Sequence, residues 1–390
     1  MKPAYILASY RTPGCRANKG KFKDMRPDDL AALAIKGLLE RTDVDPATID
    51  DVYIGCSFPE GEQGMNLGRI AALRAGLPIE VSGETINRFC SSGLQSISHA
   101  AERIMCGFAD CIIAGGAESM TCVPMGGLKY AANPGLMVAK GENYSNMGIT
   151  AELVAAKYGV SRPEMDEFAA GSHAKAAAAI DAGRFKDEII PVEIEDCRLV
   201  NGKMQKRKSI VDIDDGVRRG TTAASLAKLR TVFKSDGVVT AGNSSQTTDG
   251  AAMTMLVSED YLKKIGKQPF GRFIAFAVKG VPPELMGIGP IAAIPAALKL
   301  AALKQDDLQL IELNEAFAAQ ALACIKTLGL NPDIINVNGG AIALGHPLGC
   351  TGAKLTATLL HEMGRRNLRY GMVSMCIGGG MGAAGVYEKL

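Results

Sequence analysis

The sequence predicts a layered α/β fold made of two similar halves with a long insertion between them. Segments typical of strands and helices alternate over residues 1–117 and again over 265–390. This alternation stops over residues 118–242, where Met, Gly and Pro turns surround an Ala-rich helix near 169–182. Glycine makes up 45 of the 390 residues, well above the usual share of about 7%, so many tight turns or close backbone contacts are expected.

The first half begins with a short strand and an amphipathic helix. Apolar residues recur at helical spacing over 28–40, and Asp28 is a suitable N-cap for that helix. Gly76 is placed to end the next helix. We therefore expect strands at 5–8, 52–55 and 111–114, an extended segment at 81–87, and helices at 28–40, 66–74 and 91–105.

The second half repeats this organisation. We expect helices at 291–303, 316–328 and 351–364, with extended segments at 308–313, 334–338 and 372–376. In both halves a cysteine begins a helix that leads to a strand ending in glycines: Cys90 precedes the pair at 115–116, and Cys350 precedes the run at 378–380. This self-similarity indicates a duplicated unit.

Composition excludes several classes of protein. There are 43 Lys and Arg against 41 Asp and Glu, a net charge of +2, which argues against nucleic-acid binding through bulk positive charge. The N-terminal apolar run is too short for a signal peptide, and no apolar run reaches the ~18 residues of a membrane span. The ten cysteines contain no CxxC pair, so we expect no metal site and reduced thiols in the cytoplasm.

Four segments could carry chemistry. Cys90 lies between a predicted strand and a helix, where backbone N–H groups and the helix dipole favour a thiolate. The alternative is a small buried thiol. His346 is the only histidine within a glycine-rich loop, 338–352, and could be held out into a cleft as a general base or oxyanion donor. The alternative is a turn histidine satisfied by the backbone.

The other two segments follow predicted strands. Cys376 faces the glycine run 378–380, whose N–H groups could bind an anion; a core cysteine is the alternative. Asn314 and Glu315 lie at a strand-to-helix junction, where helix capping is the alternative. All four segments occupy junctions of the type where α/β folds bind ligands, so we expect them to form one site.

These motifs, in this order, resemble the signatures of the thiolase family. They read NRFCSSGLQ at 87–95, NEAFA at 314–318, GGAIALGHPLGCTGA at 339–353 and CIGGGMG at 376–382. The resemblance covers the whole chain and is nearest to the degradative 3-ketoacyl-CoA thiolase and acetyl-CoA acetyltransferase branch. It implies two layered βαβαβ units in an α-β-α-β-α sandwich, and a dimer or tetramer.

The resemblance also implies domains and catalytic roles. Residues 1–117 and 243–264 would form the N-terminal domain, 118–242 a loop domain that binds coenzyme A, and 265–390 the C-terminal domain. Cys90 matches the acylated nucleophile, His346 its base, and Cys376 the thiol that moves protons at the reacting carbon. Asn314 matches the residue that positions water in one oxyanion hole; the N–H groups of Cys90 and Gly378 match the other.

The implied reaction is the reversible cleavage of a 3-ketoacyl-CoA by CoA in fatty-acid β-oxidation. Thiolysis needs a soft nucleophile, an acid/base for the acetyl-CoA carbanion and two anion holes. The four segments supply these parts. We therefore expect CoA as a substrate and no other cofactor, and a cytoplasmic homo-oligomer without nucleic-acid partners.

The insertion offers positions for CoA. Nine basic residues against three aspartates lie within 201–234, a local balance of +6 that would attract the phosphates of CoA; a solvated charged face is the alternative. Arg218 and Ser245 match family positions near the nucleotide and pantetheine, and Met147 and Phe317 match apolar positions around the pantetheine and acyl group.

Two departures favour the degradative branch. Asn146 precedes Met147 where the short-chain biosynthetic branch usually has histidine, and the nucleophile motif reads Ser-Ser-Gly instead of Gly-Ser-Gly. The alternatives are a short-chain acetyl-CoA acetyltransferase, a decarboxylating condensing enzyme such as a 3-ketoacyl carrier-protein synthase, and a non-catalytic acyl-CoA carrier on the same scaffold. A condensing enzyme would lack NEAFA, and a carrier would have lost part of the catalytic set.

Overall fold

A computed structural model describes residues 2–200 and 203–390, with the side chains of 2–195 and 204–390. The strands outside the insertion fall into two groups, and the last strand of the first group, β8, follows the insertion in the sequence. The first group is β1 (Ala4–Arg11), β2 (Cys15–Arg16), β3 (Asp51–Gly55), β4 (Glu84–Ile86), β5 (Cys111–Ser119) and β8 (Thr248–Ser258). The second group is β9 (Gly271–Gly280), β10 (Leu310–Leu313), β11 (Tyr370–Ile377) and β12 (Met381–Glu388).

These strands confirm the predicted duplication. They form one hydrogen-bonded series in the order β10-β11-β12-β9-β1-β8-β5-β3-β4, with β2 beside β8. The order β3-β5-β8-β1 in the first half is repeated as β10-β11-β12-β9 in the second, with the same sequence of parallel, antiparallel and antiparallel pairs. Within this series, the strands of the two halves pair with one another at only three residue pairs, between β1 and β9.

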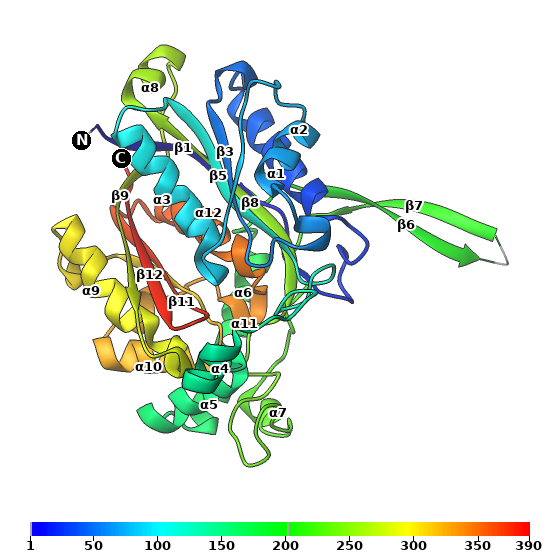
Figure 1. Ribbon diagram of the computed structural model, residues 1–390, viewed down its shortest axis with the longest axis vertical. Coiled ribbons are helices and arrows are strands. Elements are labelled where there is room, and N and C mark those ends of the chain that lie inside the picture. Colours follow the sequence, from blue (N-terminus) through cyan, green and yellow to red (C-terminus); the bar gives the residue numbers. More distant parts are fainter. Residues whose placement is uncertain (1, 201–202) are drawn as a thin grey trace.

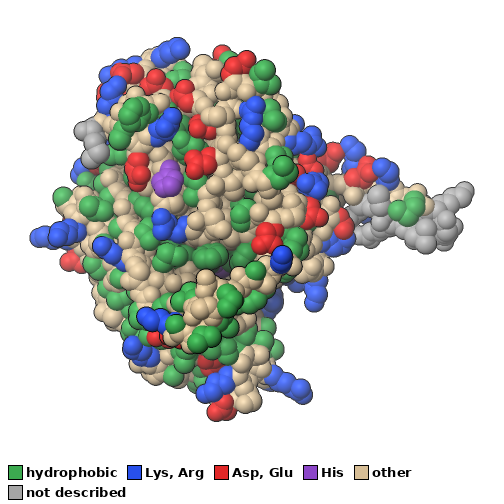
Figure 2. Space-filling model, viewed as in Figure 1, with side chains coloured by type: hydrophobic (Ala, Val, Ile, Leu, Met, Phe, Trp, Pro, Cys, Tyr) green, Lys and Arg blue, Asp and Glu red, His purple; other side chains and the backbone are tan. Residues whose placement is uncertain are grey.

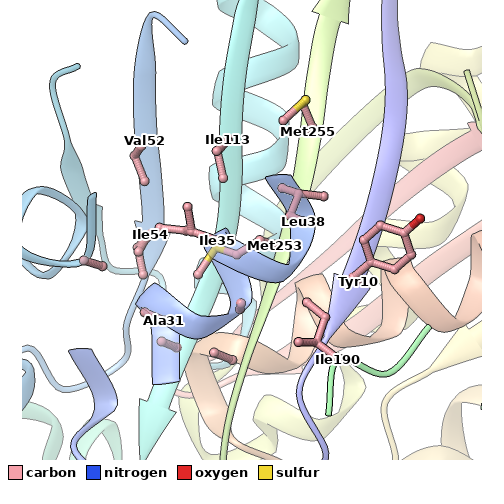
Figure 3. Packing of buried hydrophobic residues seen from close by; sticks show 14 of the residues in the cluster. Tyr10, Ala31, Ile35, Leu38, Val52, Ile54, Ile113, Ile190, Met253 and Met255 are labelled. Carbon is pink, nitrogen blue, oxygen red and sulfur yellow. The ribbon is translucent and has the colours of Figure 1, made fainter. Parts of the chain in front are cut away.

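We call the strands of the first half the first sheet and those of the second half the second sheet. The helices form three layers against these two sheets (Figure 1). They are α1 (Pro27–Thr42) and α2 (Leu67–Ala75) on the first half, α3 (Ser92–Met105) and α12 (Thr351–Arg366) in the middle, and α9 (Gly289–Ala301) and α10 (Ala318–Leu328) on the second half. Three apolar clusters hold the layers together. Figure 3 shows the first of them, in which Ile35 and Leu38 of α1 pack with Ile54, Ile113 and Met253 of the sheet.

The middle layer explains how the halves meet. Side chains of α3 and α12, among them Ile97 and Leu359, share one cluster with Ile112 of the first sheet and Val373 of the second. The third cluster joins α9 and α10 to the outer face of the second sheet. The predicted α-β-α-β-α sandwich is therefore confirmed, with the N-termini of α3 and α12 side by side at its centre.

The insertion contributes separate helices and a hairpin. Its helices are α4 (Pro134–Lys140), α5 (Met147–Tyr158), α6 (Arg162–Asp181) and α7 (Ala223–Leu226), and β6 (Val192–Val200) pairs with β7 (Lys203–Val211) in a hairpin that projects from the body (Figure 1). Hydrophobic side chains gather on the surface near α4 (Figure 2), where Val138 is 90% exposed. The domain boundaries at 117/118, 242/243 and 264/265 stay a prediction.

Short helical turns complete the chain: η1 (Pro46–Thr48), η2 (Gly61–Gln63), η3 (Phe89–Ser91), η4 (Gly141–Tyr144), η5 (Pro283–Ile288), η6 (Gln305–Asp307), η7 (Pro332–Ile334) and η8 (Leu348–Cys350). Two small helices remain. In the sequence, α8 (Glu259–Ile265) lies between β8 and β9, and α11 (Ala341–Leu344) lies between α10 and α12.

Two local expectations were wrong. Arg26, in an extended conformation, is the N-cap of α1 and Pro27 is its first residue, because the fixed φ of proline suits that position; Asp28 instead lies inside the first turn. The segment 334–338 forms no strand: it makes only one isolated parallel bridge, between Ile335 and Ile311, at the position that β4 holds in the first half.

One helical stretch of the described chain, Pro283–Ala301, is long and apolar enough to cross a membrane by composition. Half of its most apolar window is buried, and Ala293, Ile294 and Ala297 pack in the cluster beneath the second sheet. A core helix passes the same test, so this stretch is weak support for a membrane span.

Candidate active site

The turn that carries Cys90 is held in a strained conformation. Phe89 has φ +43°, which is uncommon for a residue with a bulky side chain. The Asn87 side chain accepts a hydrogen bond from the Phe89 N–H at 2.8 Å, and the Ser92 hydroxyl donates to the Phe89 carbonyl at 2.6 Å. These bonds fix η3 and present Cys90, which is half-buried, at the start of α3.

Close packing of α3 on α12 brings the Cys90 turn next to the His346 loop. A Cβ on Gly93 would lie 2.8 Å from the Gly349 carbonyl oxygen, and a Cβ on Gly352 would lie 2.6 Å from the Leu94 nitrogen. Any larger side chain at either position would push the two helix N-termini apart. The glycines of two motifs that lie more than 250 residues apart in the sequence therefore serve one contact.

The Cys90 thiol is protonated at rest. Burial raises the pKa of Cys90 to about 11, and the charge of Glu118 raises it further; the N–H groups of Gly378 and of Cys90 itself act in the opposite direction. The two N–H groups that the sequence predicted to form an anion hole thus both favour the charged form of the Cys90 thiol. Formation of the thiolate needs a base beside it.

His346 is suited to be that base. It is buried, although the sequence suggested a side chain held out into a cleft. Its Nδ1 lies 2.6 Å from the Thr351 hydroxyl, and its Nε2 lies 3.4 Å from Asn314 Nδ2. Burial and the charge of Lys354 lower the pKa of His346 to about 3, so the imidazole is neutral and can accept a proton. With Nδ1–H donated to Thr351, Nε2 carries the lone pair, which faces the amide nitrogen of Asn314.

Asn314 directly follows β10 and is completely buried. Its N–H donates to the Ser374 carbonyl of β11 at 2.9 Å, which fixes the backbone. Its side-chain Oδ1 has no hydrogen-bond partner among the described residues. An orphaned acceptor of this kind costs about 1–3 kcal/mol when buried, so it indicates a bound water or ligand atom at this position.

Cys376 lies near the end of β11 with no exposed surface. Burial raises the pKa of Cys376 well above its ordinary value, and interaction with Cys90 and with Cys324 raises it further. The effect of Cys90 shows that the two thiols are close enough to interact. Cys376 is therefore protonated at neutral pH, the state from which a thiol can donate a proton to a carbanion.

Two of the four residues expected near CoA pack with Cys376, and a third is bonded to the backbone of the same cluster. Met147 and Phe317 belong to the same apolar cluster as Cys376, and the Met147 sulfur lies 3.6 Å from the place of a Cβ on Gly378. Ser245 donates its N–H to the Ala316 carbonyl at 2.9 Å. Arg218 is different: it lies on an exposed segment, where its N–H donates to His173 Nδ1 at 3.1 Å.

The nine basic residues of 201–234 do not form one face. Lys206 and Lys208 lie on the projecting hairpin and pair with Glu195 and Glu193 across it, each at 2.6 Å. Arg219 pairs with Asp181 at 2.7 Å. The side chain of Lys203 lies outside the described residues. The β-pairing therefore carries part of this segment away from the body, and contact of the segment with CoA stays a prediction.

Sequence reasoning missed Glu118. This buried carboxylate at the end of β5 accepts hydrogen bonds from Ser57 N–H at 2.7 Å, Gly349 N–H at 2.8 Å and Gln63 Nε2 at 2.6 Å. It thereby ties the loop after β3 to the loop that contains His346. A charged residue directly after the apolar run CIIAGGA was the available signal, because such a residue is buried only when it has partners.

Nothing in the described residues resembles a metal site: no group of three or more His, Cys, Asp or Glu side chains is arranged to hold an ion. The nine cysteines in the described part are free thiols. The donors available around Cys90 are thus thiols, one imidazole, amides and backbone N–H groups, a set suited to acyl transfer between thioesters.

His173 predicts a pH dependence of stability. Burial, and secondly the charge of Arg218, lower the pKa of His173 from 6.5 to about 4. The unfolded chain therefore binds a proton in this range that the folded protein does not. This contribution to the free energy of unfolding is complete above pH 6.5 and is lost, at up to about 1.4 kcal/mol per pH unit, as the pH falls toward 4.

Urea unfolding at pH 7 and pH 5 measures this contribution. We expect His173→Gln, which keeps an acceptor for the Arg218 N–H, to lose less stability between the two pH values than the unmodified protein does. An identical loss in both proteins would show that His173 does not titrate as its burial implies.

Comparison with family models covers nearly the whole chain. Residues 4–260 match the model described as thiolase, N-terminal domain, and residues 267–389 match thiolase, C-terminal domain. The chain is 54% identical over 389 residues to the 3-ketoacyl-CoA thiolase of Bacillus subtilis (strain 168), covering 100% of both. It is 50% identical to the peroxisomal 3-ketoacyl-CoA thiolase 2 of Arabidopsis thaliana, covering 98% of this chain and 83% of that protein.

Solved structures show the same fold. Human mitochondrial 3-ketoacyl-CoA thiolase superposes with a TM-score of 0.90 at 40% identity, covering 100% of this chain and 99% of that one. The acetyl-CoA acetyltransferase of Bacillus anthracis superposes with a TM-score of 0.91 at 38% identity, with the same coverage.

Proposed function

The chain belongs to the thiolase family and is an acyltransferase, and on that premise we propose that it cleaves 3-ketoacyl-CoA with CoA through an acyl intermediate on Cys90. Two groups of residues support the proposal: Asn314 lies against His346, and Cys90 interacts with the Gly378 N–H and with Cys376. The close approach of Gly93 to Gly349 brings the turns that carry Cys90 and His346 together.

In the first half-reaction, Nε2 of His346 takes the Cys90 proton and the thiolate attacks the keto carbon of the substrate. The carbon–carbon bond then breaks, leaving an acyl group on Cys90 and the carbanion of acetyl-CoA. The Cys376 thiol gives its proton to that carbanion, and acetyl-CoA leaves. In the second half-reaction, the Cys376 thiolate takes the proton of the CoA thiol, whose sulfur attacks the acyl group. Acyl-CoA leaves, and Cys90 recovers its proton from His346.

Two anion holes stabilise the thioester oxygens during these steps. The N–H groups of Cys90 and Gly378 supply one, since both stabilise negative charge on the Cys90 sulfur. The imidazolium of His346 and a water on the orphaned Oδ1 of Asn314 supply the other. Loss of one such donor typically costs about 10²–10³ in rate.

The substrate lies along the apolar wall beside Cys376. We assign Met147 and Phe317 to the pantetheine and acyl group, because both share a cluster with Cys376. Ser245 follows Ser244, which bridges Phe317, and its own N–H donates to the Ala316 carbonyl, so we assign it to the pantetheine; exposed Arg218 is assigned to the nucleotide. CoA serves as substrate, and we propose no other cofactor. A homodimer or homotetramer in the cytoplasm, with β-oxidation as its pathway, stays a prediction.

A short-chain acetyl-CoA acetyltransferase is the second candidate, favoured by the name of the B. anthracis protein, which has the same fold. Asn146 and the sequence Ser91-Ser92 favour the degradative enzyme, as do the names of the B. subtilis and A. thaliana relatives. The carrier alternative is disfavoured because the catalytic set is complete.

Rates of thiolysis with acetoacetyl-CoA and with a long-chain 3-ketoacyl-CoA distinguish the two enzymes. We expect the long-chain substrate to be cleaved at least as fast as acetoacetyl-CoA, because the apolar residues around Cys376 give the acyl chain a surface to pack against. Cys90→Ala serves as the background control. Activity confined to acetoacetyl-CoA would assign the protein to the short-chain class.

A further inference from the structure

Lys354 is a buried lysine in contact with the loop that carries His346. It lies in the first turn of α12 and is 4% exposed. Its ammonium group donates to the carbonyl oxygens of Leu344 at 2.9 Å and Gly345 at 3.2 Å. These are the two residues that directly precede His346 in the chain.

The backbone at this point requires such a donor. The helix α11 has four residues and ends at Leu344, so the carbonyls at its C-terminal end have no partners within the helix. Gly345 then adopts φ +83° and ψ 160°, a region open almost only to glycine. A Cβ on Gly345 would lie 2.3 Å from the Thr248 hydroxyl. The Lys354 ammonium thus satisfies the carbonyls of a turn that has little freedom to rearrange.

The charge of Lys354 is balanced by buried partners. Burial lowers the pKa of Lys354, and the charge of Arg11 lowers it further; the charges of Asp214, from the insertion, and of Glu188 oppose this change and favour the ammonium. The Arg11 guanidinium binds Asp214 at 2.7 and 2.9 Å and Glu188 at 2.6 Å. Two cations and two carboxylates therefore form one neutral buried cluster. Unbalanced charges at such a depth cost several kcal/mol, so this cluster keeps the ammonium in place.

Hydrogen bonds close to this cluster in the chain also join the insertion to the His346 loop. Two residues after Asp214, the Gly216 carbonyl accepts a hydrogen bond from Gln246 Nε2 at 2.9 Å, and the same Nε2 donates to the Ile342 carbonyl of α11 at 2.9 Å. The backbone N–H of His346 donates to the Gln246 carbonyl at 3.0 Å. The segment that leads to Arg218 and the turn that presents the imidazole are therefore held by shared partners.

We propose that Lys354 is a positioning residue for thiolysis, which holds the backbone of 344–346 so that the His346 imidazole meets Asn314 and Cys90. This inference rests on the proposed function. Lys354 touches no substrate: it acts through two carbonyls on the orientation of the base. A misplacement of a catalytic group by about 1 Å costs about 10²-fold in rate.

Lys354→Met removes the donor and keeps the aliphatic volume. We expect kcat for thiolysis to fall roughly 10²-fold, with KM for CoA changed by less than about threefold. The rate of Cys90 alkylation by iodoacetamide, followed on the Cys90 peptide by mass spectrometry, should fall in parallel, because that reaction needs the thiolate made by His346. Lys36→Met, at an exposed position of α1, is the control and should match the unmodified protein.

Lys354→Gln, which retains one polar donor, is measured beside it in case the methionine variant does not fold. A cooperative thermal transition in either variant with kcat and Cys90 alkylation as in the unmodified protein would overturn the inference. Failure of both variants to fold would also overturn it, since Lys354 would then serve stability alone. Absence of Cys90-dependent thiolysis in the unmodified protein would overturn the proposed function instead.

Discussion

Replacement of Cys90 by alanine is expected to abolish thiolysis and leave the fold intact. The sulfur is the atom that receives the acyl group, and loss of a catalytic nucleophile typically costs about 10⁴–10⁶ in kcat. The fold should survive because the bonds that shape the turn join Asn87 and Ser92 to the backbone of Phe89, and none uses the Cys90 side chain. The thiol is only half-buried, so its removal leaves no enclosed cavity.

Two measurements check this result. The first is CoA-dependent consumption of a 3-ketoacyl-CoA. The second is the mass of the intact protein after incubation with acetyl-CoA, which should increase by one acetyl group in the unmodified protein and not in Cys90→Ala. Cys106→Ala is the matched control, because Cys106 is an exposed thiol at the other end of α3. Normal thiolysis by Cys90→Ala would refute the assignment of the nucleophile.

The six main helices of the two halves could be predicted closely because they carry local signals, whereas α4, α5 and α7 of the insertion were not predicted. Asn66 caps α2 at its start, where its side chain accepts from the Arg69 N–H, and Gly76 ends the helix in the left-handed conformation. These signals lie within a few residues of the element that they define. The one misplaced cap, Asp28 for Arg26, came from a proline whose effect on φ outweighs a missing side-chain bond.

Several long strands were not predicted, and the reason is their burial. The strand β8 reads TDGAAMTMLVS, and every residue in it is buried. Such a strand shows no alternation of apolar and polar residues, and Gly, Ala and Met have little intrinsic preference for strands. The strand β12 has the same character. Only pairing with neighbours distant in the sequence determines these elements, and a local pattern does not contain that information.

The site also contains residues that a local sequence pattern predicts and residues that it does not. Cys90, His346 and Cys376 stand out because each lies beside glycines at the end of an element. The residues that hold them do not: Arg11 meets Asp214 across 203 positions in the sequence, and the Gly349 N–H meets Glu118 across 231. Their importance follows from burial and shared partners, which appear only when the two halves and the insertion are assembled.

Replacement of Cys376 by serine is expected to separate the two half-reactions. Serine keeps the size of the side chain, but its hydroxyl is a far weaker acid than a thiol. Proton transfer by a positioned group typically contributes about 10²–10⁴ in rate, so condensation of two acetyl-CoA molecules should slow by that factor. Acetylation of Cys90 by acetyl-CoA should continue, because that step takes its proton through His346, whose partners Thr351 and Asn314 are unchanged.

The experiment follows both steps in one preparation: acetylation as mass gained by the intact protein, and condensation as acetoacetyl-CoA formed. Cys111→Ser is the matched control. Cys111 is a buried thiol at the start of β5, and it packs in the cluster around α1, whereas Cys376 belongs to another cluster. Condensation at the normal rate in Cys376→Ser, with acetylation lost, would exchange the roles of the two thiols. Loss of both steps with a normal thermal transition would make Cys376 necessary for acylation too, since Cys90 and Cys376 interact across a site with no exposed surface at Cys376.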